Sequence, residues 1–230
     1  RADEFTFEVT DMDVLENNTV YKGNNRGKVI TDTQVELISD NFLYLKKVNR
    51  LEAFGDVQLT DIKSNVIINA EEMIYLKSDE IIYTLGKTLI NVDGKYNIEG
   101  HDITLLKNEM ILSSNKKATI TDNISNIYKL DKFQYSINQE MLKGEKVTHI
   151  NSKTSLKKDE YYFETGFFDL KESKFLGKNV NIKFHKTLYN NKLNDPRILA
   201  ASSYGNEYNS YLEKAIFTSC KKTDKCPPWK

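Results

Sequence analysis

The stretch AEEMIYLKSDEIIYTLG, residues 70–86, decides the fold, because it matches SDNFLYLKKVNRLEAFG, residues 39–55, position by position. In both, an apolar run ends in a tyrosine (Tyr44 or Tyr75), a polar turn follows, and a second run closes on a glycine. Short runs rich in β-branched and aromatic residues, separated by a polar turn, are typical of a β-hairpin. Each stretch therefore predicts two strands joined by a tight turn.

The pattern returns along the chain with a period of about thirty residues, the signature of a repeat architecture. One column of large side chains at equivalent points of the repeats, spaced by 31, 30, 30 and 33 residues, contains Tyr44, Tyr75, Leu105, Tyr135 and Phe168. A second column, spaced by 31, 29, 29 and 33 residues, contains Gly55, Gly86, Asn115, Gly144 and Gly177. Because glycine and asparagine best tolerate positive φ, the second column predicts a bend or bulge in every repeat.

The strands between these columns alternate apolar and polar residues, as in Val66, Ile68 and Ala70. No segment keeps a helical apolar period over three turns. The sequence therefore predicts an all-β fold in which hairpins stack into an elongated open sandwich or solenoid. We expect a single domain over residues 1–230 with five to six repeats, the first thirty residues being a degenerate opening repeat. Residues 194–230 form a distinct, cysteine-containing segment.

Composition and motifs point away from several function classes. The chain has 33 basic and 33 acidic residues, so its net charge does not suggest a nucleic-acid partner. Its three histidines, His101, His149 and His185, lie far from one another and from both cysteines, so no metal-ligand spacing occurs. Neither a phosphate-binding glycine loop nor a nucleophile elbow is present. We expect no enzyme activity, no metal and no cofactor, and we expect His149 and His185 to be surface or groove-facing residues.

Strand alternation also predicts which side chains face inward. The inward set is Phe5, Phe7, Val35, Leu37, Val66, Ile68, Ile98, Tyr128, Leu130, Tyr161 and Phe163. A closed core is one interpretation of this apolar face. The other is an open trough for lipid, because small residues alternate with bulky ones on it and because burying alkyl groups needs no directional partners.

The repeats and the tail together resemble one family. Ser39 to Tyr44 leading to Gly55, and Ala70 to Tyr75 leading to Gly86, resemble the OstA-type β-jelly-roll repeats of lipopolysaccharide transport proteins. The tail segment KAIFTSC, residues 214–220, followed by CPPW, residues 226–229, is similar to the "F-T-x-C … W" segment of the LPS-assembly outer-membrane proteins, the LptD family.

This resemblance implies the periplasmic domain of an outer-membrane translocon, cut before its C-terminal barrel. It implies that lipopolysaccharide passes with its acyl chains in a hydrophobic groove, and that the domain performs no chemistry. The implied partners are the preceding periplasmic bridge protein, the chain's own barrel and the plug lipoprotein of that barrel. The implied location is the periplasmic side of the outer membrane. The run from Phe5 to Val9 is the candidate edge strand for the bridge protein.

Cys220 and Cys226 are the two cysteines of the chain. In the family, a cysteine at the place of Cys220 forms a disulfide with the barrel, and the resemblance favours such a pairing for at least one of the two. A local Cys220–Cys226 bridge is also sterically feasible, so the connectivity stays open.

Two alternatives remain beside the translocon domain. The first is a soluble bridge protein of the same pathway. The second, from a different class, is a β-solenoid carbohydrate-binding or adhesin module. In that module tyrosines such as Tyr204, Tyr208 and Tyr211 would stack on sugars from an outward face, and the interior would be dry and closed.

Overall fold

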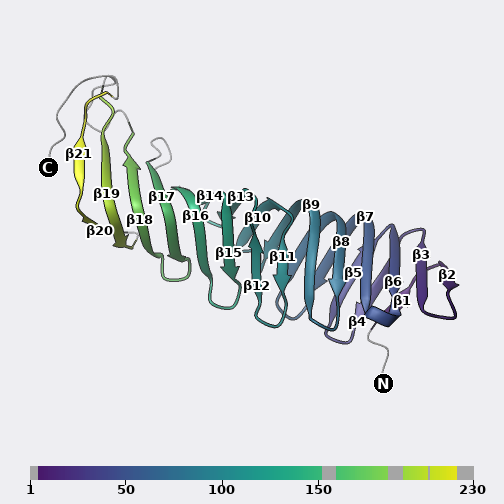
Figure 1. Ribbon diagram of the computed structural model, residues 1–230. Helices are drawn as coiled ribbons and strands as arrows, with labels where there is room; N and C mark the ends of the chain where they lie inside the picture. The colour runs from purple at the N-terminus through teal and green to yellow at the C-terminus, as the bar shows by residue number, and fades with distance from the viewer. Residues whose placement is uncertain (1–4, 152–158, 186–193, 207, 222–230) are drawn as a thin grey trace. The chain divides into compact units, whose positions relative to one another are not determined.

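The computed structural model describes residues 5–151, 159–185, 194–206 and 208–221. The chain divides into two compact units, unit 1 over residues 1–116 and unit 2 over residues 117–230. Within the described residues the regular structure is β-strand, apart from one 3-10 turn, η1 (Lys46–Val48). The predicted all-β class is therefore confirmed, and Figure 1 shows the strands of each unit lying side by side.

Unit 1 is built from antiparallel hairpins. Its strands are β1 (Phe5–Glu8), β2 (Asp11–Leu15), β3 (Val20–Asn24), β4 (Gly27–Thr31), β5 (Val35–Ser39), β6 (Asn41–Leu45), β7 (Arg50–Asp61), β8 (Val66–Leu76), β9 (Ile81–Val92), β10 (Tyr96–His101), β11 (Thr104–Leu106) and β12 (Ile111–Ser114).

The long strands of unit 1 belong to two layers at once. The first half of β7 pairs with β6, whereas its second half pairs with β5, and the register shifts between Phe54 and Val57. β8 and β9 change layers in the same way. Layer 1 thus contains β1, β4, β5, β10 and one half of each long strand, and layer 2 contains β2, β3, β6, β11, β12 and the other halves.

Residues in left-handed backbone conformations make the bends between the layers. Gly55 has φ +77° and Gly86 has φ +80°, values that L side chains rarely adopt. The backbone N–H of Asp40 donates to the carbonyl oxygen of Gly55 at 3.0 Å, and the N–H of Gly86 donates to Oδ1 of Asp102 at 2.7 Å. These bonds satisfy backbone groups that the bulge removes from the ladder.

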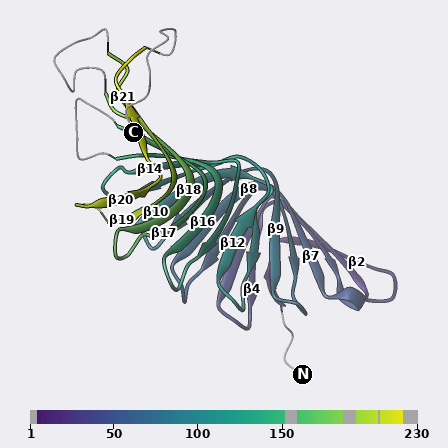
Figure 2. The ribbon, with the colours of Figure 1, turned by 60° about the vertical axis from the view of Figure 1, so that its left-hand side comes forward.

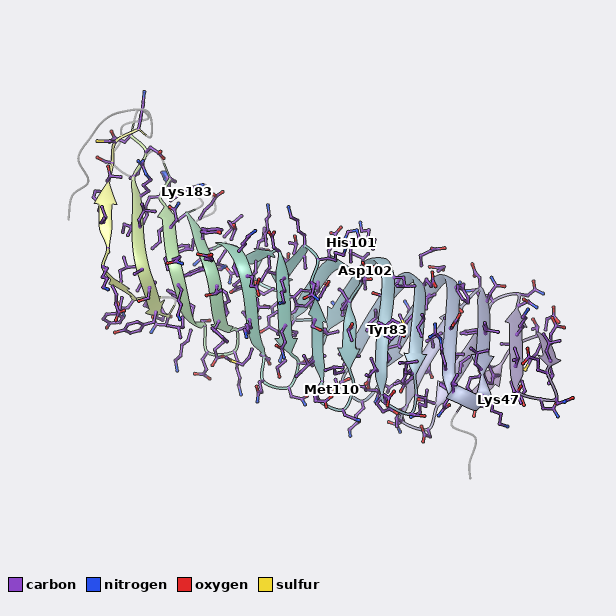
Figure 3. All side chains as sticks on the ribbon, in the orientation of Figure 1. Lys47, Tyr83, His101, Asp102, Met110 and Lys183 are labelled. Carbon is purple, nitrogen blue, oxygen red and sulfur yellow. The ribbon has the colours of Figure 1, made fainter. Side chains whose placement is uncertain are left out.

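The edge opposite the bends is called the mouth. In unit 1 it is formed by the turns that join successive strands within each layer, away from the bends. Figure 3 shows His101 and Asp102 at the bend edge of unit 1, with Lys47 and Met110 at the opposite edge. The turns that carry Lys47 and Met110 form the layer 2 side of the mouth.

Unit 2 repeats this plan. Its strands are β13 (Ala118–Asp122), β14 (Ile127–Leu130), β15 (Lys132–Ser136), β16 (Met141–Ile150), β17 (Glu160–Asp169), β18 (Lys174–Lys183), β19 (Arg197–Gly205), β20 (Ser210–Glu213) and β21 (Ile216–Thr218). Strands β16 to β19 are long and curved, as Figure 2 shows for β16, β17 and β18. In layer 1, β14 pairs with one half of β16 and β21 pairs with one half of β19. In layer 2, β15 pairs with the other half of β16 and β20 pairs with the other half of β19.

The first repeat column of the sequence lies in the interior of the fold. Its members are Tyr75, Leu105, Tyr135 and Phe168, all 3% exposed or less, and Tyr44, which is half-buried. The same residues lie in layer 2 at equivalent points of successive hairpins. The alternation read from the sequence therefore gave the correct face in both units.

The predicted glycine column is correct at Gly55 and Gly86 and wrong at its other three positions. Gly144 and Gly177 lie inside β16 and β18 without positive φ, and Asn115 has no positive φ either. Inside the long strands β16 and β18 the left-handed residues are instead Lys146 and Asn179, each with φ +50°.

The glycines of unit 2 instead provide space. Gly144, Gly166 and Gly177 pair in one row across β16, β17 and β18. A Cβ atom on Gly177 would lie 2.1 Å from the ring of Phe163, and one on Gly166 would lie 2.6 Å from the ring of Phe168. The row allows these aromatic rings to lie flat against the backbone.

We predict that Gly177→Ala lowers the free energy of unfolding by about 2 kcal/mol, because the new methyl group overpacks against Phe163. The loss should shrink in a Phe163→Leu background, where the aromatic ring is gone. Urea denaturation of the four proteins of this double-mutant cycle measures the coupling. Additive effects would show that Gly177 is not there to make room for the ring.

Candidate functional site

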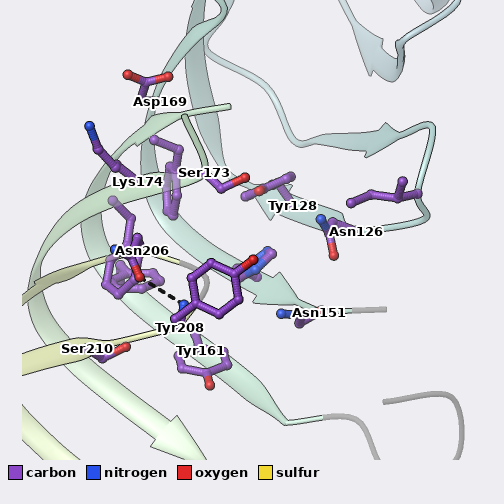
Figure 4. Close-up of a pocket in the computed structure, with 15 residues that line it drawn as sticks. Asn126, Tyr128, Asn151, Tyr161, Asp169, Ser173, Lys174, Asn206, Tyr208 and Ser210 are labelled. Atoms are coloured by element: carbon purple, nitrogen blue, oxygen red, sulfur yellow. Dashed lines mark hydrogen bonds between the residues drawn. The ribbon is translucent and has the colours of Figure 1, made fainter. Parts of the chain in front are cut away.

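The candidate site is a pocket between the two layers of unit 2. It has a volume of about 160 Å³. Its lining comes from β14, β16, β17, β18 and β20 and from the turns beside them: Ile124, Asn126, Tyr128, His149, Asn151, Tyr161, Phe163, Phe168, Asp169, Ser173, Lys174, Phe175, Asn206, Tyr208 and Ser210. Figure 4 shows these side chains converging on one space.

Aromatic rings form the floor of the pocket. The ring of His149 stacks on Tyr128 with centroids 4.4 Å apart and planes inclined by 19°. Phe168 from layer 2 makes edge contacts with Tyr128 at 5.3 Å and with Phe163 at 5.4 Å. Phe175 packs on Phe163 at 5.7 Å. These contacts join the two layers beneath the pocket through apolar surface.

Polar groups form the rim. Asp169, Ser173 and Lys174 surround the turn between β17 and β18 on one side. On another side, Oδ1 of Asn206 accepts hydrogen bonds at 2.9 Å from the backbone N–H of Tyr208 and from that of Asn209. This turn holds Tyr208 beside the pocket, with its backbone bond to Asn206 drawn in Figure 4. An apolar floor with a polar rim fits a ligand that has an apolar end and a polar end.

His149 is the one histidine of the pocket. Burial lowers its pKa to about 4, although a backbone hydrogen bond at Ile127 and the charge of Asp122 oppose the shift. Its Nδ1 atom is buried and has no hydrogen-bond partner among the described residues. The imidazole is thus neutral at neutral pH and behaves as a flat, weakly polar ring.

Two tyrosines of the pocket are neutral for the same reason. Burial raises the pKa of Tyr128, and the nearby charge of Asp122 adds to the rise. Burial also raises the pKa of Tyr161, with Asp159 contributing. A floor of uncharged rings offers neither a nucleophile nor an acid–base pair. The arrangement can bind apolar groups by burial and contact.

Three of the predicted inward residues, Tyr128, Tyr161 and Phe163, line this pocket. Leu130 is buried in the same unit at 3% exposure. The remaining predictions fall in unit 1, where Val35, Leu37, Val66, Ile68 and Ile98 are 2% exposed or less, Phe5 is 5% exposed and Phe7 is half-buried. All of them point inward or partly inward, but in unit 1 they lie in a packed interior. Lipid contact at these residues stays a prediction.

Sequence reasoning left several pocket residues out of the predicted set. Phe168 belonged to the repeat column and His149 was expected to face the surface or a groove. The sequence therefore contained information that could have placed both residues at the pocket. Phe175 shares a strand face with Gly177, which places it inward by alternation. Asn206 and Tyr208 lie in a turn, where alternation gives no information about direction.

The N-terminal edge and the tail also hold predicted residues. β1 pairs with β4, and no other strand of the described chain pairs with it. Phe5 packs on Tyr44 at 5.0 Å and on Tyr75 at 5.9 Å, which anchors β1 to layer 2. Cys220 is disulfide-bonded, and its carbonyl oxygen accepts a hydrogen bond from Nη1 of Arg197 at 2.7 Å. Cys226 lies outside the described residues.

The described part of the chain has neither a metal-binding cluster of side chains nor a membrane-spanning helix. No group of three or more histidine, cysteine, aspartate or glutamate side chains there could hold a metal ion. Within those same residues, no helix has the length and apolar character to cross a membrane.

Comparison with known proteins gave one kind of match. No family model matches the sequence. No curated protein matches it either. Among solved structures, the chain is similar to LptH from Pseudomonas aeruginosa, described as the LptA homologous periplasmic component of the conserved lipopolysaccharide transport device. The TM-score is 0.43 and the identity 10%, over 47% of this chain and 79% of LptH.

The buried histidine predicts a pH-dependent stability. Since the pKa of His149 is about 4 in the folded protein and 6.5 for a histidine exposed to water, the unfolded chain binds more protons between these values. Stability is then complete above pH 6.5 and falls as the pH drops toward 4. We expect a loss of about 2 kcal/mol between pH 7 and pH 5.

Urea denaturation at both pH values measures this loss, and the matched variant His149→Phe should remove it while keeping an aromatic ring on Tyr128. If the variant loses as much stability as the parent protein over that pH range, then His149 is not the responsible group.

Proposed function

We propose that this chain binds the acyl chains of lipopolysaccharide between its two β-layers, with the pocket of unit 2 as a binding site. The observation that carries the proposal is the neutral, aromatic floor between the layers, surrounded by a polar rim. The repeat pattern, whose hairpins resemble OstA-type repeats, supports the same class of ligand.

The size and lining of the pocket suit the end of an acyl chain. An apolar cavity of about 150 Å³ can hold a molecule of the size of benzene, so the pocket can accept the end of one acyl chain. Each methylene buried there contributes about 0.8 kcal/mol. The hydroxyl and amide groups of Ser173, Asn126 and Asn206 on the rim can meet the polar part of the lipid.

Within lipopolysaccharide transport we propose the role of the periplasmic domain of the outer-membrane translocon. The support is the tail, in which a strand-like run leads to Cys220 and then to Cys226 and Trp229. A disulfide from the tail to a C-terminal barrel with its plug lipoprotein, formed when a barrel thiol exchanges with the bond that Cys220 makes in this chain, belongs to this proposal. So does pairing of the free edge of β1 with a periplasmic bridge protein. The alternative within the pathway is a soluble bridge protein, which has the same groove without the barrel.

Photocrosslinking tests the acyl-binding site. A photoreactive phenylalanine analogue replaces Tyr161 or Phe175 in the pocket, and Lys129, an exposed residue of β14, serves as the outward control. We expect lipopolysaccharide adducts at Tyr161 and Phe175 and none at Lys129 in cells that make lipopolysaccharide. Absence of adducts at all three positions, in protein that is folded and correctly located, would contradict the proposal.

A second candidate function has its own observation. Phe167, Leu176, Tyr204 and Tyr211 are paired neighbours in one row across β17, β18, β19 and β20, and each is 44% exposed or more. Tyr204 and Tyr211 stack on each other at 5.1 Å. An exposed aromatic row on an outward face is the feature that a carbohydrate-binding module needs.

The double substitution Tyr204→Ala with Tyr211→Ala separates the two functions. If the chain binds acyl groups in the pocket, the adducts at Tyr161 persist at an unchanged yield, because both tyrosines lie on the outer face. A carbohydrate-binding module would instead lose most of its retention on immobilised polysaccharide. Retention is measured by affinity electrophoresis, with Lys178→Ala as the surface control.

A further inference from the structure

Two ion pairs connect the layers of unit 1 at its mouth. Nζ of Lys77, in the turn after β8 of layer 2, lies 3.0 Å from Oδ1 of Asp32, in the turn after β4 of layer 1. Nζ of Lys107, after β11 of layer 2, lies 3.5 Å from Oδ2 of Asp61 at the end of β7 in layer 1. Each pair thus bridges the edge at which the two layers would separate.

Three of the four side chains in these pairs are withdrawn from water, whereas the side chain of Asp32 is 52% exposed. The side chain of Lys77 is 6% exposed and that of Lys107 is 12% exposed, while Asp61 is only 2% exposed. Lys77 also bonds Glu80, which accepts a hydrogen bond from the hydroxyl of Tyr75 at 2.6 Å. Burial by itself would lower the pKa of Lys77, but the hydrogen bonds and charges of Glu80 and Asp32 raise it. Lys77 is therefore charged when the mouth is closed.

The two lysines occupy equivalent places in successive hairpins. The backbone N–H of Lys77 donates to the carbonyl oxygen of Asn49, and that of Lys107 donates to the carbonyl oxygen of Glu80. In unit 2 the same backbone bond joins Leu170 to Glu140. Leu170 thus holds in unit 2 the position that a buried lysine holds in unit 1. The residue before it, Asp169, lines the pocket of unit 2.

The ionic mouth of unit 1 is not required by the fold. A buried ion pair is generally no more stabilising than well-packed apolar side chains of similar volume, since both charges lose their hydration. The leucine in unit 2 is an example of the apolar solution on the same hairpin plan. Ion pairs have a different property, because water or a competing charge can replace each partner once the layers begin to part.

We propose that Lys77 with Asp32 and Lys107 with Asp61 form a latch that holds the mouth of unit 1 closed, so that its interior becomes accessible only when these ion pairs separate. The proposal deepens the acyl-binding function and rests on it for its purpose, since a lipid could enter unit 1 only through the opened mouth. The closing action itself can be tested without lipid.

The test uses the paired substitution Asp32→Asn with Asp61→Asn. It removes the two carboxylate charges that face Lys77 and Lys107 but keeps the other hydrogen bonds at these positions. Lys77 retains Glu80, and an asparagine at position 61 can still accept the hydrogen bonds that Oδ1 of Asp61 receives from the backbone N–H groups of Lys63 and Ser64, at 3.1 and 3.2 Å. Access is measured as the alkylation rate of a cysteine placed at Val66, which is fully buried and pairs with Asp61.

We expect this rate, followed by mass spectrometry, to rise at least about tenfold, because local opening no longer separates opposite charges. The matched control is Asp56→Asn at the bend edge, which breaks the 3.0 Å pair with Arg26 but leaves Arg26 bonded to Asp40. That control should not change the rate.

An unchanged rate in the paired variant overturns the latch. So does a rise no larger than the loss of global stability measured in urea, since that rise reports unfolding and not opening of the mouth. Failure of the acyl-binding function has a different signature, namely absence of lipopolysaccharide adducts at Tyr161 in unit 2. A photoreactive residue in place of Ile68 then tests whether the latch controls lipid entry into unit 1. We expect a higher yield of lipopolysaccharide adducts in the Asp32→Asn, Asp61→Asn variant than in the Asp56→Asn control.

Discussion

The structure depends on one constraint: each long strand must contribute to two facing layers, so its backbone must bend sharply without losing its ladder on either side. In unit 1 Gly55 and Gly86 meet this constraint with positive φ, and backbone bonds to Asp40 and Asp102 restore the lost pairing. Because side chains alternate along a strand, one bend places the inward residues of both halves opposite each other. The interior, the mouth and the pocket all follow from this arrangement.

The sequence predicted the parts of the fold that depend on local periodicity. Val66 and Ile68 were assigned to the inner face correctly because a period of two is visible in a few residues. Gly177 was wrongly predicted to mark a bend. A glycine is needed there because the ring of Phe163 on the neighbouring strand leaves no space for a Cβ atom, and this contact cannot be read from the local sequence. The partnership of Lys77 with Asp32, 45 residues apart, was equally invisible, since it depends on which turns meet at the mouth. Alternation placed Tyr128, Tyr161 and Phe163 on the inner face that lines the pocket, but it gave no sign of the polar rim, which a turn supplies.

The two units use the same hairpin plan with different chemistry at the mouth. Lys77 and Lys107 join the layers of unit 1 through buried charges, whereas Leu170 holds the equivalent backbone position in unit 2. Unit 2 combines this with an aromatic floor whose histidine is neutral at neutral pH. A single repeated scaffold can thus present a closed interior in one unit and a ligand pocket in the other through a few side chains at fixed positions.

The most direct test of acyl binding between the layers is an NMR measurement of nuclear Overhauser effects from the acyl chains of bound lipopolysaccharide to aromatic ring protons of the protein. The account predicts contacts to the rings of Tyr128, Tyr161 and Phe175 and none to Tyr204 or Tyr211. Contacts confined to Tyr204 and Tyr211 would contradict it, because the lipid would then lie on the outer face and the space between the layers would not be its binding site.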